Sequence, residues 1–270
     1  MRKLCCAAIV LFLLSAFAPV NADMNTADAE SWNEIKGKHF IVYYVDNKKF
    51  AKKVLSRAEK YYNKIARDLG FSRYDNFWSW ENRAKIYLYR THDDFVRATG
   101  KDPWIYGTVR YREKEIISYA WSKGLLNSLL PHEITHIIFR DFVGFPLADG
   151  GGIPLWLDEG VAQWEEDARR AVSVKLVRKL IKDKSYIPIN ELMKTDVRTK
   201  SDYELSVKFY AQAVTLVGYM IKEYGSLKFN LFCRQLRDGK SVNAALGFVY
   251  TNSIFDVEKL EKKWLEYYSK

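Results

Sequence analysis

Two histidines and a distant glutamate in this chain have the spacing of a catalytic metal site. The segment His132-Glu133-Ile134-Thr135-His136 reads H-E-x-x-H, and Glu159 follows 23 residues after His136. Histidines four residues apart lie one turn apart on one face of a helix, so both imidazoles can reach one ion. Two imidazoles and a carboxylate around an open position are the ligands of a catalytic zinc. We predict that His132, His136 and Glu159 bind one Zn²⁺ per chain.

Glu133 has the position that a general base would need beside such a site. It follows His132 directly, one step round the helix, close to the open fourth position of the metal. Zn²⁺ would lower the pKa of a water bound there, and Glu133 would take the proton of that water. We therefore predict peptide-bond hydrolysis by Glu133-assisted attack of zinc-bound water, with Glu133 returning the proton to the leaving amine.

Glu159 has another interpretation, as one of several solvated acidic residues. Asp158 precedes it, and Glu165 and Glu166 follow. Its immediate neighbours are apolar or small, however, and a buried carboxylate needs a cationic partner. This favours Glu159 as the third ligand. Asp158 is the alternative ligand, and Asp141 is a candidate to support one of the histidines from behind.

The motif is preceded by an α/β pattern and followed by a helical one. Residues 39–45, 84–89, 106–111 and 116–121 have the composition of strands, the last two as a hairpin, and residues 50–69 have helical spacing. Helices are predicted at about 155–167, 170–182, 203–224, 227–237, 241–249 and 254–268. We predict an α+β fold in which residues 23–124 form an α/β lobe with a mixed sheet and residues 125–270 a helical lobe.

Three further features of the sequence concern the surroundings of the site. Pro131 fits the first turn of the motif helix if that helix starts near Ser128. The glycine-rich loop at residues 144–154 joins the two metal-binding helices and could border a cleft between the lobes. The strand at 116–121 directly precedes the motif, and we expect it to form the sheet edge beside the metal. An extended peptide could bind there as an added strand.

The N-terminus has the organisation of a secretory signal. Arg2 and Lys3 precede an apolar run, and residues 19–22 end with small residues at the expected cleavage site. We predict a signal peptide at residues 1–22 and a periplasmic or secreted bacterial protein, with a retained membrane anchor as the alternative. Cys233 would then be the one cysteine left in residues 23–270, and its apolar neighbours indicate a small buried side chain.

The charge of the chain points to anionic partners. The formal net charge is +10, and removal of Arg2 and Lys3 with the signal would leave +8. In an exported protein, such an excess favours an anionic cell-envelope surface or acidic substrates. Nucleic acid is not expected, because the basic residues are scattered and the chain leaves the cytoplasm. The sequence predicts no oligomeric state.

The motif and the segment Trp156-Leu157-Asp158-Glu159-Gly160-Val161-Ala162 together resemble the gluzincin metallopeptidases, in particular the bacterial peptidase MA-like family. Thermolysin and the aminopeptidases are more distant relatives. The resemblance implies a zincin-like fold with the active site in the cleft between two lobes. In such families, a tyrosine of a later helix stabilises the tetrahedral oxyanion. The segment Phe209-Tyr210-Ala211-Gln212-Ala213 resembles that helix, so Tyr210 is the candidate, with core packing as the alternative.

Two departures from the relatives narrow this expectation. The G-x-M-E-N segment with which aminopeptidases bind a free amine does not precede the motif, which favours an endopeptidase. Thermolysin-like enzymes place an aspartate four residues after the glutamate ligand to orient a histidine. This chain has Gln163 there, so the support of the histidines must be built differently.

Two other functions use the same residues. A peptidase-fold binding or assembly module of the cell envelope would keep the metal for stability, with little or no catalysis. A non-haem iron oxygenase uses the same ligand types, but its ligands usually lie on strands at closer spacing. Trp78 and Trp80 could form a platform for peptide or glycan, although packing in the core is the commoner use of such residues.

Overall fold

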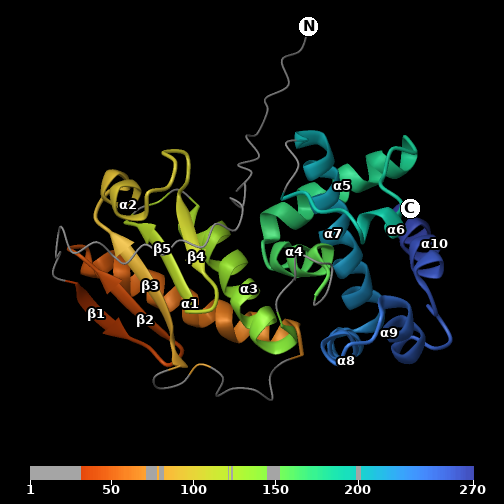
Figure 1. The fold of residues 1–270 in the computed structure, drawn as a ribbon, viewed down its shortest axis with the longest axis horizontal. Coiled ribbons are helices and arrows are strands. Elements are labelled where there is room, and N and C mark those ends of the chain that lie inside the picture. The colour runs from red at the N-terminus through yellow and green to blue at the C-terminus, as the bar shows by residue number, and fades with distance from the viewer. Residues whose placement is uncertain are drawn as a thin grey trace, which may run out of the picture.

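The computed structural model describes residues 32–70, 78, 82–120, 122, 124–144, 153–198 and 202–270. The expected signal peptide, Trp80 and the glycines at 150–152 lie outside this part of the chain. The described residues form an α+β structure with one five-stranded sheet, and the helices that follow α3 gather on the side of α3 away from the sheet (Figure 1).

The sheet is mixed, as the sequence predicts. Its strands are β1 (Asn33–Lys36), β2 (Phe40–Tyr44), β3 (Ala84–Tyr89), β4 (Gly107–Arg110) and β5 (Glu115–Tyr119), in the spatial order β1-β2-β3-β5-β4. The three central strands β2, β3 and β5 are parallel, and β1 and β4 run antiparallel to their neighbours. Only β1 was not expected from the sequence.

The expectation that residues 116–121 form the sheet edge is wrong. β5 pairs with β3 on one side and with β4 on the other, so β4 is the outer strand among the described residues. The reason is that Glu115, Ile116, Ile117 and Ser118 are all buried, which requires cover on both faces and suits a central strand. The chain therefore places β4 at the edge first and then turns inward to β5.

One face of the sheet is covered by the helix α1 (Lys48–Asp68). Its apolar residues recur at helical spacing and are buried against β2, and Asn47 caps its first turn by accepting from the backbone of Phe50. Trp78 lies in the same core, fully buried against Phe40 and Tyr62. It is therefore a packing residue and not a substrate platform.

The predicted hairpin and the short helix after β3 are both present. Thr91 caps α2 (His92–Thr99) in a reciprocal arrangement with Asp94. The helix α2 packs beside β3 and β5.

The motif helix α3 (Leu130–Val143) is entered through a π-helical turn at Leu125–Leu129. Pro131 lies in the first turn of α3, where backbone N–H groups have no partner within the helix, so the missing N–H of proline costs no hydrogen bond. Nearly every side chain of α3 is buried, including Ile134 and Phe139, because α1 packs on one side and α4 (Leu155–Trp164) on another. A helix buried on most sides holds its polar residues in fixed positions, which is what a metal site requires.

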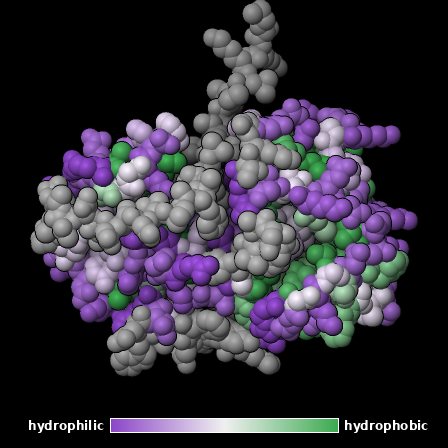
Figure 2. All heavy atoms as spheres, viewed as in Figure 1, coloured by the Kyte–Doolittle hydropathy of each residue, from purple (hydrophilic) through white to green (hydrophobic). Residues whose placement is uncertain are grey.

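The remaining helices are α5 (Asp167–Lys182), α6 (Ile189–Leu192), α7 (Tyr203–Tyr224), α8 (Ser226–Arg237), α9 (Val242–Val249) and α10 (Val257–Tyr268). All but the four-residue α6 were expected. Cys233 is buried on α8, as predicted. Figure 2 shows more apolar side chains on this helical half than on the sheet half. Within the described residues, no helix is both long and apolar enough to cross a membrane.

Two glycines allow α4 and α7 to approach closely. A Cβ at Gly160 would lie 2.6 Å from the backbone oxygen of Ala213 on α7. On the opposite side of the same contact, a Cβ at Gly218 would collide with the ring of Trp164 on α4. Since Gly160 directly follows Glu159, this close packing fixes the position of the expected third ligand.

Candidate metal centre

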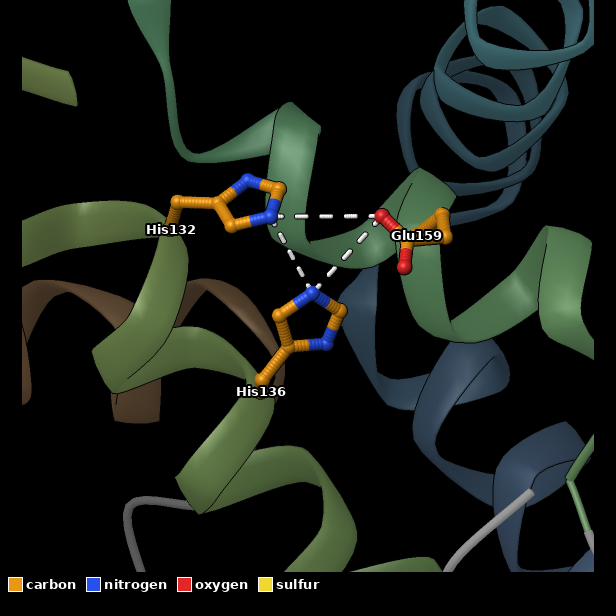
Figure 3. Close-up of side chains that lie close together, drawn as sticks. All are labelled: His132, His136 and Glu159. Carbon is orange, nitrogen blue, oxygen red and sulfur yellow. Dashed lines mark hydrogen bonds and ion pairs between the residues drawn. The ribbon is translucent and has the colours of Figure 1, made fainter. Parts of the chain in front are cut away.

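The three predicted ligands come together between α3 and α4, pointing toward one another (Figure 3). The Nε2 atoms of His132 and His136 are 3.1 Å apart. The Oε2 atom of Glu159 lies 3.9 Å from Nε2 of His132 and 3.7 Å from Nε2 of His136. His132 is partly exposed, whereas His136 and Glu159 are buried.

The size of this triangle fits a zinc ion. Two ligand atoms that are each about 2.1 Å from a tetrahedral ion are about 3.4 Å apart, near the middle of the observed separations. Glu159 is 1 % exposed, and neither of its carboxylate oxygens makes a hydrogen bond with another described residue. A buried carboxylate in that condition is strongly disfavoured unless a cation lies beside it. The residues present therefore fit a bound metal ion.

Asp158, the alternative candidate ligand, contacts His136 and Arg140. The Oδ1 atom of Asp158 lies 3.1 Å from Nδ1 of His136. Nδ1 is the ring nitrogen of His136 that does not face Glu159 (Figure 3). Arg140 donates from Nη2 to Oδ2 of Asp158 at 2.6 Å, and both side chains are buried. The carboxylate therefore fixes the ring of His136 from behind, leaving Nε2 for a metal ion.

His132 is supported by a different residue, Glu166. Nδ1 of His132 lies 2.8 Å from Oε1 of Glu166, whose other oxygen accepts from the hydroxyl of Ser128 and pairs with Arg169 at 3.0 Å. The acid that holds this histidine thus comes seven residues after Glu159, instead of four. No sequence signal distinguishes Glu166, because it lies in a charged stretch beside Glu165 and Asp167.

Asp141, the expected support, lies elsewhere. Its Oδ2 atom accepts from the indole N–H of Trp78 and pairs with Lys114, both at 2.8 Å. Since Asp141 is five residues after His136, it projects from another side of α3. It links the motif helix to the sheet half and takes no part in the metal centre.

The charges around His136 favour its protonated form when no metal is bound. Burial lowers the pKa of His136, but attraction by Asp158, together with Glu159, outweighs burial and raises the pKa to about 10. Burial raises the pKa of Asp158 and of Glu166, yet their cationic partners outweigh this and hold both pKa values below the ordinary range. Both supporting groups are therefore carboxylates at neutral pH.

Glu133 lies on the same helix as the two histidines and contacts a residue that the sequence did not indicate. The hydroxyl of Tyr111 donates to Oε2 of Glu133 at 2.9 Å. The ring of Tyr111 meets the ring of His136 edge-on, with centroids 5.8 Å apart. The guanidinium of Arg140 lies over the ring of Tyr111, 3.8 Å from its centroid. No local pattern marks Tyr111, because it belongs to the hairpin turn after β4.

Tyr210, the predicted oxyanion donor, is partly buried on α7, the helix that packs against α4. Burial, followed by the negative charge of Glu159, raises its pKa well above the ordinary value, so the phenol keeps its proton. The neutral hydroxyl can act as a donor near Glu159. Its role in catalysis stays a prediction.

Comparison with protein families identifies one match. The family model described as the peptidase MA superfamily matches residues 78–270, which include β3, the motif helix and every residue of the metal centre. A search of curated proteins finds no match to the chain.

Proposed function

The chain belongs to the peptidase MA superfamily, and on this basis we propose that it is an exported zinc-dependent endopeptidase. One observation carries the proposal: His132, His136 and Glu159, whose buried carboxylate makes no hydrogen bond with a described residue, converge within reach of a single ion. The carboxylates behind both histidines complete the arrangement typical of a bound zinc. The family match, which is to peptidases, favours this interpretation over the oxygenase alternative.

Each residue of the site has a part in the proposed reaction. A zinc ion held by His132, His136 and Glu159 would supply a Lewis acid that polarises the peptide carbonyl and acidifies a water. Glu133 accepts the proton of that water and passes it to the leaving amine. Tyr210 donates a hydrogen bond to the oxygen that becomes negatively charged.

The outer strand β4 is the proposed place for an extended substrate. β4 pairs with β5 on one side, and its chain continues directly into Tyr111, which contacts Glu133. A peptide that pairs with the other side of β4 would therefore be led toward the general base. Such binding does not depend on a chain end, which agrees with an endopeptidase.

The first experiment measures zinc content and cleavage of a mixed peptide library by residues 23–270, with and without chelator. One zinc per chain and chelator-sensitive cleavage are expected. Glu133→Gln should keep zinc and lose turnover, and His132→Ala should lose zinc. Undiminished turnover in Glu133→Gln would disprove the mechanism, and zinc without any cleavage would favour the binding module.

A second function, binding to an anionic envelope surface, has support from α1. The outer side of this helix carries six exposed basic residues that form no ion pair with another described residue: Lys48, Lys49, Lys52, Lys53, Arg57 and Lys60. The two acidic residues of α1 pair elsewhere, Glu59 with His39 and Asp68 with Lys64. One side of α1 therefore presents six positive charges, which suits an anionic surface.

Vesicle sedimentation tests this second function. We expect binding to phosphatidylglycerol vesicles, no binding to phosphatidylcholine vesicles, and loss of binding in high salt. Replacing Lys49, Lys53 and Lys60 with glutamine should weaken binding by at least tenfold, since each lysine contributes about 1 kcal/mol at such a surface. The same change at Lys175, Lys179 and Lys182 of α5 removes equal charge and serves as the control.

Export is the third part of the proposal. It depends on residues 1–22, whose composition is that of a cleaved signal. Expression of the full chain in a bacterial host should yield a periplasmic or secreted product that begins at Asp23. A product of full length in the membrane fraction would favour the retained anchor.

A further inference from the structure

Tyr111 joins the two halves of the molecule at the general base. It is the first residue after β4 and thus belongs to the sheet half, whereas Glu133 lies on the motif helix α3. Its hydroxyl donates to Oε2 of Glu133 at 2.9 Å. A hydrogen bond to a carboxylate is among the stronger kinds, and this one lies in a largely buried environment where Glu133 is 5 % exposed.

The ring of Tyr111 is itself held in place. The guanidinium of Arg140 lies over it, 3.8 Å from its centroid, and Arg140 is fixed by hydrogen bonds to Asp158 from two of its nitrogens. Asp158 in turn faces Nδ1 of His136. The same buried ion pair therefore supports a metal ligand on one side and the partner of the general base on the other.

The hydrogen bond from Tyr111 gives the two carboxylate oxygens of Glu133 different roles. A carboxylate next to a metal ion is attracted to the ion and can rotate toward it, which would fill the position that a water needs. With Oε2 held by the phenol, Oε1 remains the oxygen that can accept a proton from that water. A base fixed in this way loses less freedom when the reaction begins.

We propose that Tyr111 is a positioning residue for the general base: through its hydroxyl it keeps Glu133 off the metal and directs Oε1 toward the attacking water. This inference rests on the proposed peptidase function. Tyr111 is distinct from Tyr210, which would contact the substrate oxygen, because Tyr111 acts through Glu133.

The first test is Tyr111→Phe, which removes the hydroxyl and keeps the ring under Arg140. We expect unchanged zinc content, an unchanged KM and a kcat lowered roughly 10- to 100-fold, as for other groups that orient a catalytic residue. Tyr186→Phe is the matched control, because Tyr186 also donates to a carboxylate, that of Glu261 on α10, away from the metal centre. Its kcat and KM should not change.

A raised KM with an unchanged kcat would overturn the proposal, since it would make Tyr111 a substrate-binding residue. Unchanged kinetics in Tyr111→Phe, with a wild-type enzyme that cleaves peptides, would also overturn it. If the wild-type protein cleaves no peptide, the proposed peptidase function is wrong. That failure can be told apart from a failure of the Tyr111 proposal, because it is seen without the variant.

A second test needs neither metal nor substrate. Unfolding of the metal-free protein in urea is compared for Tyr111→Phe, Glu133→Ala and the double variant. If the two side chains hold each other, the change in the unfolding equilibrium constant of the double variant should differ about tenfold from the product of the two single changes. This is the size expected for a hydrogen bond to a charged group. Tyr186→Phe combined with Glu133→Ala should be additive. Additive effects for Tyr111 and Glu133 would show that the phenol does not hold the carboxylate.

Discussion

The two histidines of the candidate metal centre turn the same ring nitrogen, Nε2, toward Glu159, but the residues behind them differ. Behind His136 lies Asp158, paired with Arg140, and all three side chains are in the interior. Behind His132 lies Glu166, which pairs with Ser128 and with Arg169, whose side chain is 26 % exposed. His132 itself is 13 % exposed, whereas His136 is fully buried.

This difference indicates the direction from which water and substrate approach. The side of His136 is closed by a buried ion pair and by Tyr111, so it is built for rigidity. The side of His132 is nearer to solvent, so the open metal position should face it. The comparison can be tested by weakening each side in turn.

Weakening the buried side should have the largest effect. Arg140→Met removes the cation and leaves Asp158 buried without its main partner, which should lower the free energy of unfolding by about 3–5 kcal/mol. Urea unfolding of the metal-free protein measures this. Arg169→Met, at the partly exposed pair, should cost no more than about 1 kcal/mol. Equal losses for the two variants would remove the distinction between the two sides.

Weakening the other side should act on the metal more than on the fold. Glu166→Ala removes the acceptor for Nδ1 of His132 and should lower zinc affinity roughly 10- to 100-fold, measured by competition with a chelator. Glu166→Gln keeps an oxygen at that position and should recover part of the affinity. A variant with wild-type affinity would mean that His132 needs no support from Glu166.

A pH dependence of zinc affinity tests the account of the buried side without any substitution. Because the pKa of His136 is about 10 without metal, a proton occupies the imidazole at neutral pH and must leave when zinc binds. Zinc affinity should therefore rise roughly tenfold per pH unit between about pH 7 and pH 9, from this group. Asp158→Asn should lower that pKa and flatten the dependence. A flat profile in the wild type would contradict the assigned proton.

Elements with a clear period could be predicted from the sequence, and elements defined by their neighbours could not. The spacing of apolar residues on α1 and α7 is visible without a structure. β1 has the polar sequence Asn33-Glu34-Ile35-Lys36, which becomes a strand only by pairing with β2. β5 lies inside β4 because consecutive residues of β5, including Ile116 and Ile117, are buried on both faces of the sheet. Two consecutive apolar residues could have indicated a central strand.

The candidate ligands could be predicted, the two histidines from their local spacing and Glu159 from its apolar neighbours, whereas the residues that support the histidines could not. The supporting carboxylates depend on how α4 and the segment after it lie against α3, so neither Glu166 nor Asp158 could be assigned its role from spacing. Asp141 could have been set aside, since five residues do not bring a side chain back to the face of His136. Tyr111 comes from the hairpin turn after β4, and nothing in that turn reveals a contact across the molecule.

The reciprocal glycines Gly160 and Gly218 bear on which metal the protein accepts. With α4 packed closely against α7, the backbone that carries Glu159 has little room to shift toward α7. Calcium prefers about six to eight oxygen ligands, so we expect a site of two imidazoles and one carboxylate to disfavour it. Gly160→Ala, which forces the two helices apart, should displace Glu159 from the histidines and so weaken metal binding as well as the fold.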